Sequence, residues 1–474
     1  MRPFPLVSAL VLLAGCSQMP ELTMPELSLP VSWGNARPVE AAAPAVPAEV
    51  PAAWWSSFGS EELDALEQAA LAGNRDLAAA VARIEQAEAQ LKVAGAPLLP
   101  TLSADALGQV AKRSVTSTSA FSSGRSAVGG GAARTYQGSL SASYEIDFWG
   151  KTSSAIAAAR AGLDSSRFDR DTVAMTLTAG VASTWFQALA LSDRVAVARR
   201  NLEIARATME LAERQAEFGK TSALEAAQQR ANVAQIEAQL PALELQLAQA
   251  VDALAVLTGL APSRLSLATR SLEGIAAPAV EAGLPSELLR RRPDLRRAEA
   301  NLQAANANVG VARAQLFPSV ELTAERGYAS PYLVNLLDPA HIFWTLGASL
   351  TGTLFDNGKL SGNVDLAEAR VREAAAGYQG AVLTALKDVE DNLAAVGYLA
   401  GQEEAQQRAV AAAREAQRLS DVRYREGAVD YLTVLEAQRT LLQTEDAAVQ
   451  VRLARLNAAV GLFKALGGGL ESPP

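Results

Sequence analysis

Residues 74–100, NRDLAAAVARIEQAEAQLKVAGAPLLP, align without a gap with residues 292–318, RPDLRRAEANLQAANANVGVARAQLFP, at a constant offset of 218. The matched positions are Asp76 and Leu77 with Asp294 and Leu295, Ala94 and Ala96 with Ala312 and Ala314, and Leu98 and Pro100 with Leu316 and Pro318. Self-similarity at a fixed spacing is the signature of repeated structural units. The chain is therefore predicted to contain two copies of one unit.

The spacing between the two copies shortens further along the chain. Gly150 matches Gly358, and Gly219 matches Gly427, both at an offset of 208. The first copy therefore carries ten additional residues, which we assign to the Ser- and Gly-rich stretch 114–133. Low-complexity insertions are tolerated in solvent-exposed loops, so this stretch is predicted to be a loop tip.

Each copy shows the same order of hydrophobic periods. A helical period comes first, followed by two segments of two-residue alternation, a long helix and a shorter helix. In the first copy these segments are 61–96, 102–110, 136–146, 153–219 and 222–258; in the second, the strands are 320–324 and 342–354, and the helices after them are 360–427 and 430–466. Each copy is thus predicted to form a helix, a β-hairpin and a long helical hairpin.

The four predicted strands are rich in aromatic residues. Ten of the 25 aromatic side chains lie within residues 136–149 and 317–355. Tyr and Trp are enriched where a protein crosses a membrane–water interface, and alternation of apolar with polar residues is typical of a transmembrane barrel strand. A soluble β-hairpin with one buried face is the alternative interpretation.

The two long helical segments contain no Pro, and about 65 residues at ~1.5 Å per residue span roughly 100 Å. Apolar residues recur at spacings of three and four in all four helices of the predicted hairpins, as in the series Val382, Leu386, Val389, Leu393 and Val396. This spacing is typical of coiled coils. Pro241 interrupts one shorter helix, where we expect a local kink.

Composition excludes several classes of protein. Of the 474 residues, 49% are hydrophobic and 20% charged, with a single Cys and a single His. One Cys and one His cannot make an intramolecular disulfide, a Cys/His zinc site or an iron–sulfur centre. A net charge of −9 argues against a nucleic-acid-binding protein, which usually carries a basic face. We find no activated nucleophile, acid/base pair or phosphate loop, so we predict neither an enzyme nor a bound cofactor.

The N-terminus resembles a bacterial lipoprotein signal. Arg2 precedes an apolar run that ends in Leu13-Ala14-Gly15-Cys16, and Ser17 follows in place of the Asp that commonly retains lipoproteins at the inner membrane. We predict a signal peptide at 1–15, a covalent lipid on Cys16 and sorting to the outer membrane. Seven Pro residues in 17–53 indicate an extended tether, so the acylated segment 16–53 should precede a folded body that begins near Trp54. Beyond Cys16 we expect no transmembrane helix.

Four strands cannot close a barrel, and a lipid bilayer leaves no open sheet edge satisfied. The chain is therefore predicted to form oligomers. Two chains would give eight strands and a filled interior, whereas three would give twelve strands and a wider lumen. The fold class predicted from the sequence is an α+β membrane protein, in which four transmembrane strands and a long coiled-coil helical barrel per chain assemble as a trimer.

Several short motifs resemble those of the TolC-like outer-membrane factors, in the lipoprotein branch that serves resistance-nodulation-division efflux pumps. They are Trp54-Trp55 with Phe58, Asn74-Arg75-Asp76-Leu77, Tyr144-Glu145-Ile146-Asp147-Phe148-Trp149-Gly150, Arg291-Arg292-Pro293-Asp294-Leu295 with Ala298-Glu299, Phe317-Pro318, Phe355-Asp356 with Gly358, and Val429-Asp430-Tyr431-Leu432 with Glu436-Ala437-Gln438. The resemblance covers residues 54–466. It implies a homotrimer with a twelve-stranded outer-membrane barrel in contact with lipid, continuous with a helical tunnel across the periplasm.

The family resemblance also implies partners and a division of the chain. The lower end of the tunnel is expected to stay closed until a periplasmic adaptor protein and an inner-membrane resistance-nodulation-division pump dock. The first repeat would occupy 54–260, an equatorial linker 261–291, the second repeat 292–466 and a flexible tail 467–474.

The same resemblance places the closure at the hairpin tips that follow Gly219 and Gly427. Glu436 matches an acidic position of the family's gate, whereas the companion position holds Thr433 here. The repeat offset places Glu225 opposite Thr433, and Asp430 is a further candidate. Three-fold symmetry would gather such carboxylates and favour cations. The alternative is that each acid only stabilises a helix N-terminus.

Other features have structural interpretations. Pro293 and Asp294 after Arg290-Arg291-Arg292 indicate a helix start rather than a lipid-binding patch, and His341 stands alone at a strand entrance. The predicted function is the exit duct of a tripartite efflux pump for drugs or other solutes. A type I protein-secretion duct and a periplasmic coiled-coil scaffold remain as alternatives. The substrate is not readable, because in such systems the inner-membrane pump selects it.

Overall fold

The computed structural model describes residues 18–35, 45–46, 50–112, 132–219, 221–280 and 283–469, with the backbone alone for 45–46. Cys16, the signal segment 1–15 and most of the insertion 114–133 lie outside the described residues, and so does the tail from residue 470, so the predictions for them stay predictions. The chain divides into two compact units. Unit 1 contains residues up to 24 together with 85–164 and 300–376, and unit 2 contains 25–84, 165–299 and the rest from 377.

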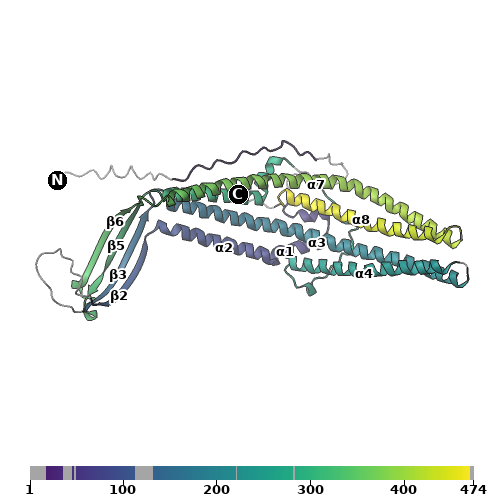
Figure 1. The fold of residues 1–474 in the computed structure, drawn as a ribbon, viewed down its shortest axis with the longest axis horizontal. Coiled ribbons are helices and arrows are strands. Elements are labelled where there is room, and N and C mark those ends of the chain that lie inside the picture. The colour runs from purple at the N-terminus through teal and green to yellow at the C-terminus, as the bar shows by residue number, and fades with distance from the viewer. Residues whose placement is uncertain are drawn as a thin grey trace. The chain divides into compact units, whose positions relative to one another are not determined.

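Unit 1 is built on a four-stranded antiparallel sheet with the strand order β2-β3-β5-β6. The strands are β2 (Thr101–Ala111), β3 (Ala133–Ile146), β5 (Ser319–Ser330) and β6 (Ile342–Thr351) (Figure 1). Both predicted β-hairpins are confirmed. The boundaries predicted for the second hairpin were wrong, because β5 continues to Ser330 through residues that pair with both β3 and β6, while β6 ends at Thr351.

The register separates the side chains of this sheet into two chemically distinct faces. Paired residues are even with even and odd with odd across all three strand pairs, so each parity occupies one face. The even-numbered residues, which we call the apolar face, include Leu102, Leu140, Ala142, Tyr144, Leu322, Tyr328, Trp344, Leu346 and Leu350. The odd-numbered residues, which we call the acidic face, include Asp105, Gln137, Ser141, Glu145, Glu321, Thr323, Glu325 and Thr345.

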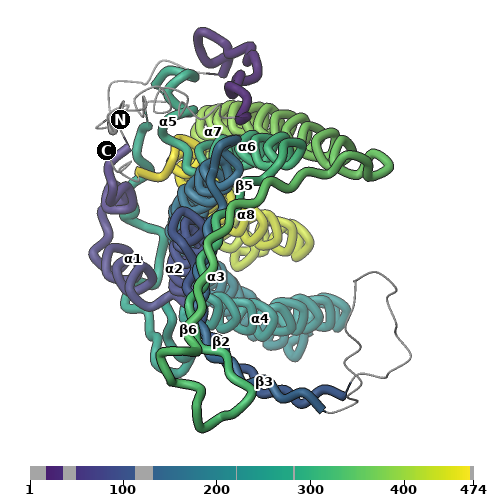
Figure 2. The backbone as a smooth tube through the Cα atoms, turned by 90° about the vertical axis from the view of Figure 1, so that its left-hand side faces the viewer, coloured from purple at the N-terminus to yellow at the C-terminus, as the bar shows by residue number. Residues whose placement is uncertain are grey.

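Aromatic packing closes the helix-side end of the sheet. Trp149 stacks on Phe317 with ring centroids 4.6 Å apart, and its Nε1 donates a hydrogen bond of 2.8 Å to the carbonyl oxygen of Pro318. At the opposite end, the connection from β5 to β6 contains two short 3-10 turns, η6 (Leu333–Asn335) and η7 (Pro339–His341), drawn in green in Figure 2. His341 lies in the second turn, at the entrance to β6, as the sequence indicated.

Unit 2 contains two long helical hairpins (Figure 1). One joins α3 (Lys151–Glu217) to α4 (Ala223–Leu257), and the other joins α7 (Lys359–Arg425) to α8 (Tyr431–Ala465). The four predicted helices are confirmed to within two residues, and their observed bounds all repeat at the offset of 208. Pro241 lies inside α4, which continues through it. The first residues of α3 and α7 belong to unit 1.

The segment before the first hairpin differs from the sequence prediction. A single helix over 61–96 was wrong: α1 (Glu61–Gly73) ends at Asn74, and a second helix, α2 (Arg75–Gly95), begins after it. The Asn74 side chain accepts hydrogen bonds from the backbone N–H groups of Asp76 and Leu77 and donates one to the carbonyl oxygen of Leu257. This anchored cap starts a new helix where helical periodicity alone indicated continuity.

The start of helix α6 is held by a buried arginine. Helix α6 (Pro293–Ala314) begins directly after Arg292, whose guanidinium pairs with Asp294 at 2.6 Å and Asp388 at 3.3 Å. Because Arg292 is 6% exposed, these contacts favour the structural interpretation of the arginine run. The remaining elements are β1 (Ala45–Val46), β4 (Ala279–Val280), α5 (Leu288–Arg291), η2 (Trp54–Phe58), η3 (Ala96–Leu98), η4 (Pro262–Arg264) and η5 (Pro285–Glu287).

Aromatic side chains form the centre of the unit 2 core. Trp54 stacks on Phe463 with centroids 5.1 Å apart, and Phe58 packs against Phe186 at 5.0 Å. All four side chains are at most 1% exposed. Glu67 of α1 is also fully buried, and neither of its carboxyl oxygens has a hydrogen-bond partner among the described residues. Burial raises the pKa of Glu67 to about 9, so this side chain is protonated at neutral pH.

By length and composition alone, α3 and α4 could cross a membrane. We expected no transmembrane helix, yet residues 172–192 of α3 contain no Asp, Glu, Lys or Arg. In α3 the apolar window is 67% buried, which the core of unit 2 explains. The window in α4 is 17% buried, so most of its apolar side chains lack cover within a single chain.

Candidate functional site: hairpin tips and a polar ladder

Both helical hairpins reverse at the glycines that the repeat pattern singled out. Gly219 and Gly427 have φ angles of 68° and 74°, a left-handed conformation that side chains with a Cβ atom rarely adopt. Each following helix begins with a side-chain cap: Ser222 for α4 and Asp430 for α8. The two caps are again 208 residues apart, so the tips are equivalent in backbone as well as in sequence.

Asp430 and Thr433 are in direct contact. The Asp430 carboxylate accepts hydrogen bonds from the Thr433 hydroxyl at 2.6 Å and from its backbone N–H at 3.0 Å. These bonds hold the pKa of Asp430 below its ordinary value, so the cap is ionised at neutral pH. Thr433 and Glu436 also line a shallow groove of 480 Å³ whose other wall includes Ala413 and Ala416 of α7.

Glu225 lies in the first tip and is not brought to Thr433 or Glu436 by any contact within the described part of one chain. Its carboxylate accepts a hydrogen bond from the hydroxyl of Thr221. It lies near two tyrosines of the other hairpin. Burial raises the pKa of Tyr431 to about 12, and burial together with the Glu225 charge raises that of Tyr424. The four predicted gate residues thus form one contacting pair, one groove neighbour and one acid beside the tyrosines.

A series of buried polar residues connects the two hairpins. Tyr431, Gln438 and Glu445 recur every seven residues along α8, and their exposed fractions are 1%, 6% and 4%. We call these three residues and their partners the polar ladder. Apolar side chains normally occupy such heptad positions, because coiled-coil helices are held together by apolar knobs.

Every step of the polar ladder ends on the first hairpin. Tyr431 donates through its hydroxyl to Gln229 of α4, whose own amide donates to the backbone carbonyl of Ala205 at 2.8 Å. Gln438 donates to the hydroxyl of Thr208 at 2.8 Å. The partners on α3 repeat with the same spacing, because Thr208 and Asn201, the partner of Glu445, are also seven residues apart.

Glu445 of α8 binds two other helices at once. Its carboxylate accepts hydrogen bonds from Asn201 of α3 at 3.1 Å and from Arg414 of α7 at 2.8 Å, and Arg200 lies 3.8 Å away. The adjacent Asp446 forms an ion pair with Arg194 of α3 at 2.6 Å. Hydrogen bonds to charged groups contribute about 1.5–3 kcal/mol each, so Glu445 is the strongest step of the ladder.

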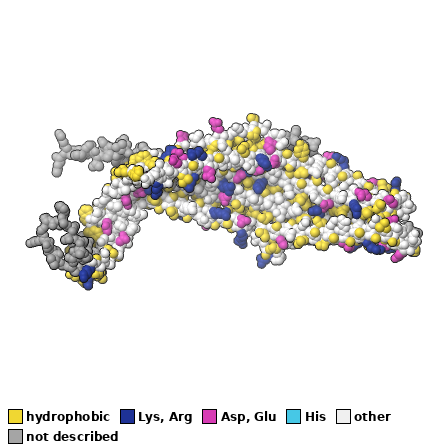
Figure 3. Space-filling model, in the orientation of Figure 1, with side chains coloured by type: hydrophobic (Ala, Val, Ile, Leu, Met, Phe, Trp, Pro, Cys, Tyr) yellow, Lys and Arg dark blue, Asp and Glu magenta, His cyan; other side chains and the backbone are white. Residues whose placement is uncertain are grey.

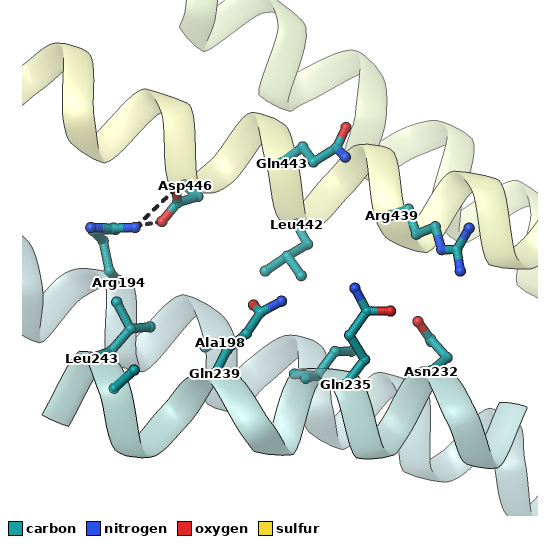
Figure 4. A pocket seen from close by; sticks show the side chains of 12 residues that line it. Arg194, Ala198, Asn232, Gln235, Gln239, Leu243, Arg439, Leu442, Gln443 and Asp446 are labelled. Atoms are coloured by element: carbon teal, nitrogen blue, oxygen red, sulfur yellow. Dashed lines mark hydrogen bonds and ion pairs between the residues drawn. The ribbon is translucent and has the colours of Figure 1, made fainter.

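A water-accessible cavity of 580 Å³ lies beside the ladder, between α4 and α8. Figure 4 shows Asn232, Gln235 and Gln239 projecting from α4 towards Leu442 of α8, with the Arg194–Asp446 pair at one end. The amide nitrogen of Asn232 is buried without a hydrogen-bond partner in the described residues. The polar ladder therefore has an open cavity lined by amide side chains on one side.

Sequence reasoning missed the polar ladder because it followed apolar side chains alone. The seven-residue spacing of Tyr431, Gln438 and Glu445 was the signal that could have identified it.

Apolar residues are exposed at the hairpin tips, where Phe218, Leu224 and Leu432 are 77%, 65% and 58% exposed. Figure 3 likewise shows hydrophobic side chains interspersed with charged ones along the helical surface.

A family model described as outer membrane efflux protein matches residues 66–260 and 284–468. Over 472 residues the chain is 42% identical to the pyoverdine export outer membrane protein OpmQ of Pseudomonas aeruginosa, covering 100% of this chain and 98% of the relative. The toluene efflux pump outer membrane protein TtgC of Pseudomonas putida is 33% identical, covering 97% and 93%.

The fold has close counterparts among solved structures. The crystal structure of the Campylobacter jejuni CmeC outer membrane channel superposes with a TM-score of 0.89 at 26% sequence identity. The match covers 96% of each chain. Sheet and helical hairpins are therefore both part of a known channel architecture.

Proposed function

Because the chain belongs to the outer membrane efflux protein family, we propose that three copies of it assemble into the exit duct of a tripartite efflux pump. The protein is an outer-membrane efflux channel that extends into the periplasm. The trimeric state, the closed barrel, the lipid on Cys16 and the position of the gate are the parts that we propose.

The open edges of the sheet carry the proposal of a trimer. In the order β2-β3-β5-β6, strands β2 and β6 each have one edge without a partner among the described residues. Unpaired backbone groups are too costly to leave in lipid, so β2 of one copy must pair with β6 of the next until the barrel closes. Three copies give twelve strands, which leave a lumen, whereas eight strands enclose only side chains or one small ligand.

The chemistry of the two sheet faces supports a proposal for which face meets the lipid and which faces the lumen. The apolar face fits contact with lipid, and the acidic face fits a water-filled lumen. The alternation predicted from the sequence supports this assignment. With Asp105, Glu145, Glu321 and Glu325 on the acidic face, three copies would line the lumen with carboxylates and favour cations.

We place the closure of the duct at the helical tips, with Glu436 and Glu225 as the acidic residues that face the constriction and Asp430 with Thr433 as the cap that shapes it. The polar ladder holds the second hairpin against the first. Its hydrogen bonds can be exchanged for bonds to water. The apolar contacts beside it are two small clusters, in which Leu211 of α3 packs against the cluster that contains Val434 and Leu442 of α8 packs against the first hairpin. The tip of α7–α8 can therefore leave α3–α4 at a lower cost than separation of the main core would require.

The remaining partners follow from the same proposal. A periplasmic adaptor and an inner-membrane pump would dock on the tip end of the duct. The two relatives named above export pyoverdine and toluene, which differ greatly in size and polarity. We therefore propose a general solute duct whose cargo is selected by the pump.

Single-channel recording in planar bilayers tests this function. The purified protein should open as small, cation-selective channels, and Glu436→Ala and Glu225→Ala should increase the conductance or reduce the selectivity. Glu415→Ala, an exposed acid on the α7 surface, is the matched control. Native mass spectrometry should give three chains of 49.6 kDa each, less the processed signal. A monomer or dimer that conducts would contradict the proposal.

A further inference from the structure

The charges of the sheet are segregated by face. All four carboxylates of the paired strands, Asp105, Glu145, Glu321 and Glu325, have odd numbers and occupy the acidic face. The two arginines of these strands, Arg134 and Arg326, have even numbers and occupy the apolar face. This face therefore carries two cations and no acid within the described strands.

Both arginines lie towards the hairpin end of the sheet, away from the helices. Arg326 shares a level with Leu140 on one side and Trp344 on the other. It is four residues from the end of β5, roughly 13 Å along the strand. Arg134 is the second residue of β3 and pairs with Val110.

The two arginines lie six residues apart in register, roughly 20 Å along the strands, and aromatic side chains lie between their levels. Tyr328 and Tyr136 lie on the same face nearer to the hairpin loops, and Trp344 is 70% exposed. In a transmembrane barrel, aromatic girdles mark the boundary between the apolar band and the headgroups. The helices extend into the periplasm, so under the proposed function this girdle is the outer one.

Both arginines are open to an anion from outside the protein. Arg134 and Arg326 are exposed, and neither has an ion-pair partner among the described residues. They lie on β3 and β5, the two central strands, whereas neighbouring copies would join at β2 and β6. A lipid-facing arginine costs about 2–4 kcal/mol at the bilayer midplane and close to nothing near the interface, where its side chain reaches the headgroups.

On this basis, which rests on the proposed function, we propose that Arg134 and Arg326 form a binding site for the phosphate groups of outer-leaflet glycolipid. The occupant is lipid A, the phosphorylated anchor lipid of that leaflet. The guanidinium groups donate to the phosphate oxygens, and the Trp344 ring borders the first segments of the acyl chains. Each trimer would carry three such sites on its outer circumference.

The test uses the purified full-length channel in detergent, titrated with bisphosphoryl lipid A and, in a second arm, with the same lipid after removal of its phosphates. Bound lipid is counted by native mass spectrometry. The variants are R134Q, R326Q, the double variant R134Q/R326Q and R326K. R160Q, which removes an exposed arginine from α3 in the same unit, is the matched control.

The wild type should bind bisphosphoryl lipid A more tightly than the dephosphorylated lipid, with an advantage that shrinks as salt increases. Each Gln substitution should weaken binding roughly fivefold, as expected for removing one cation near a charged headgroup. R326K should retain most of the affinity, and R160Q should match the wild type. Equal binding of the two lipids, or a double variant with wild-type affinity, would overturn the inference.

Single-channel conductance separates this inference from the proposed function. All variants should conduct like the wild type, because the substituted side chains face away from the lumen. A wild-type protein that conducts but binds the two lipids equally well would overturn the lipid site alone. A wild-type protein that forms no channel would overturn the proposed function, whatever it binds.

Discussion

The two ends of α8 contact the first hairpin in opposite ways. Near its C-terminus, Leu456, Val460 and Phe463 are buried in an apolar core with Trp54 and the aromatic residues of α3. Near its N-terminus, Tyr431, Gln438 and Glu445 are equally buried but make hydrogen bonds. One helix is thus anchored in the large apolar core at one end and held at the other by hydrogen bonds together with two small apolar clusters.

The difference decides which end can move. Separating an apolar contact exposes hydrocarbon to water, which costs about 25 cal/mol for each Å². Separating hydrogen-bonded groups allows both partners to bond to water, so a typical bond contributes only about 0.5–1.5 kcal/mol net. We therefore expect the C-terminal end of α8 to stay fixed and its N-terminal end, at the hairpin tip, to be releasable. The substitutions below test that contrast.

The largest effect should come from the apolar end. Phe463→Ala removes the ring that stacks on Trp54 and leaves a cavity in the core, so the free energy of unfolding should fall by about 3–5 kcal/mol. Thermal unfolding followed by circular dichroism measures the loss. Phe218→Ala is the control, because this ring is 77% exposed and its removal should change little. Similar losses for both variants would contradict the assignment of the core.

Glu67 of α1 is a fully buried polar residue in the same part of the molecule as the apolar end of α8. Its pKa is about 9 in the folded protein against an ordinary value of 4.5, so folding favours the protonated form. The contribution of protonated Glu67 to the free energy of unfolding is fully present below pH 4.5. It is lost as the pH rises towards 9, by at most about 1.4 kcal/mol for each pH unit.

Glu67→Gln keeps the shape and removes the titration. The variant should therefore exceed the wild type in stability by about 3 kcal/mol near pH 7, and this advantage should disappear as the pH falls to 4.5. Melting curves across pH 4.5–9 measure the difference, with the exposed Glu61→Gln as control. A difference independent of pH would show that Glu67 is ionised in the folded protein.

At the polar end, Glu445→Gln should have an intermediate effect. The change weakens the bonds to Asn201 and Arg414, and we expect a loss of about 1.5–3 kcal/mol. Because these partners lie on α3 and α7, the tips should also become more accessible to proteases. Glu415→Gln, which breaks an exposed pair with Arg418, should leave the stability almost unchanged. Equal losses of stability for Glu445→Gln and Glu415→Gln would mean that the buried bonds of Glu445 stabilise the fold no more than an exposed pair does.

The smallest effect on stability should come from Tyr431→Phe. This change deletes one hydrogen bond to Gln229 and retains the ring that packs against Tyr424, so the expected loss is about 1 kcal/mol. Hydrogen exchange should nevertheless rise at the α8 end near residue 431 and stay unchanged near Phe463. Uniform exchange along α8 would remove the contrast between its two ends.

Much of this fold could be predicted from the sequence because it is repeated. The offset of 208 located both helical hairpins to within two residues, and Gly219 and Gly427 do adopt the left-handed conformation that a reversal needs. The strands were found by alternation, although β5 was predicted too short because the residues after Ala324 include Glu325 and Arg326 and are held in the strand by pairing with its neighbours.

The features that escaped prediction depend on residues far apart in the chain. The cap at Asn74 interrupts a helical period and is completed by the carbonyl of Leu257. The burial of Glu67 depends on a core whose aromatic residues come from both ends of the chain. Glu436 and Thr433 were chosen as gate residues by resemblance, Glu225 by the repeat offset and Asp430 as a further candidate. A role in closing a pore depends on other copies of the chain.

The central claim is that the polar ladder parts when the duct opens. Cysteines at Thr208 and Gln438, whose side chains are joined by a hydrogen bond of 2.8 Å, can be bridged with a short bifunctional thiol reagent. Single-channel recording before and after bridging, with each single-cysteine variant as control, measures the consequence. We predict that the bridged duct stays in its low-conductance state and that the unbridged one opens further. A bridged channel that reaches the full open conductance would contradict the account.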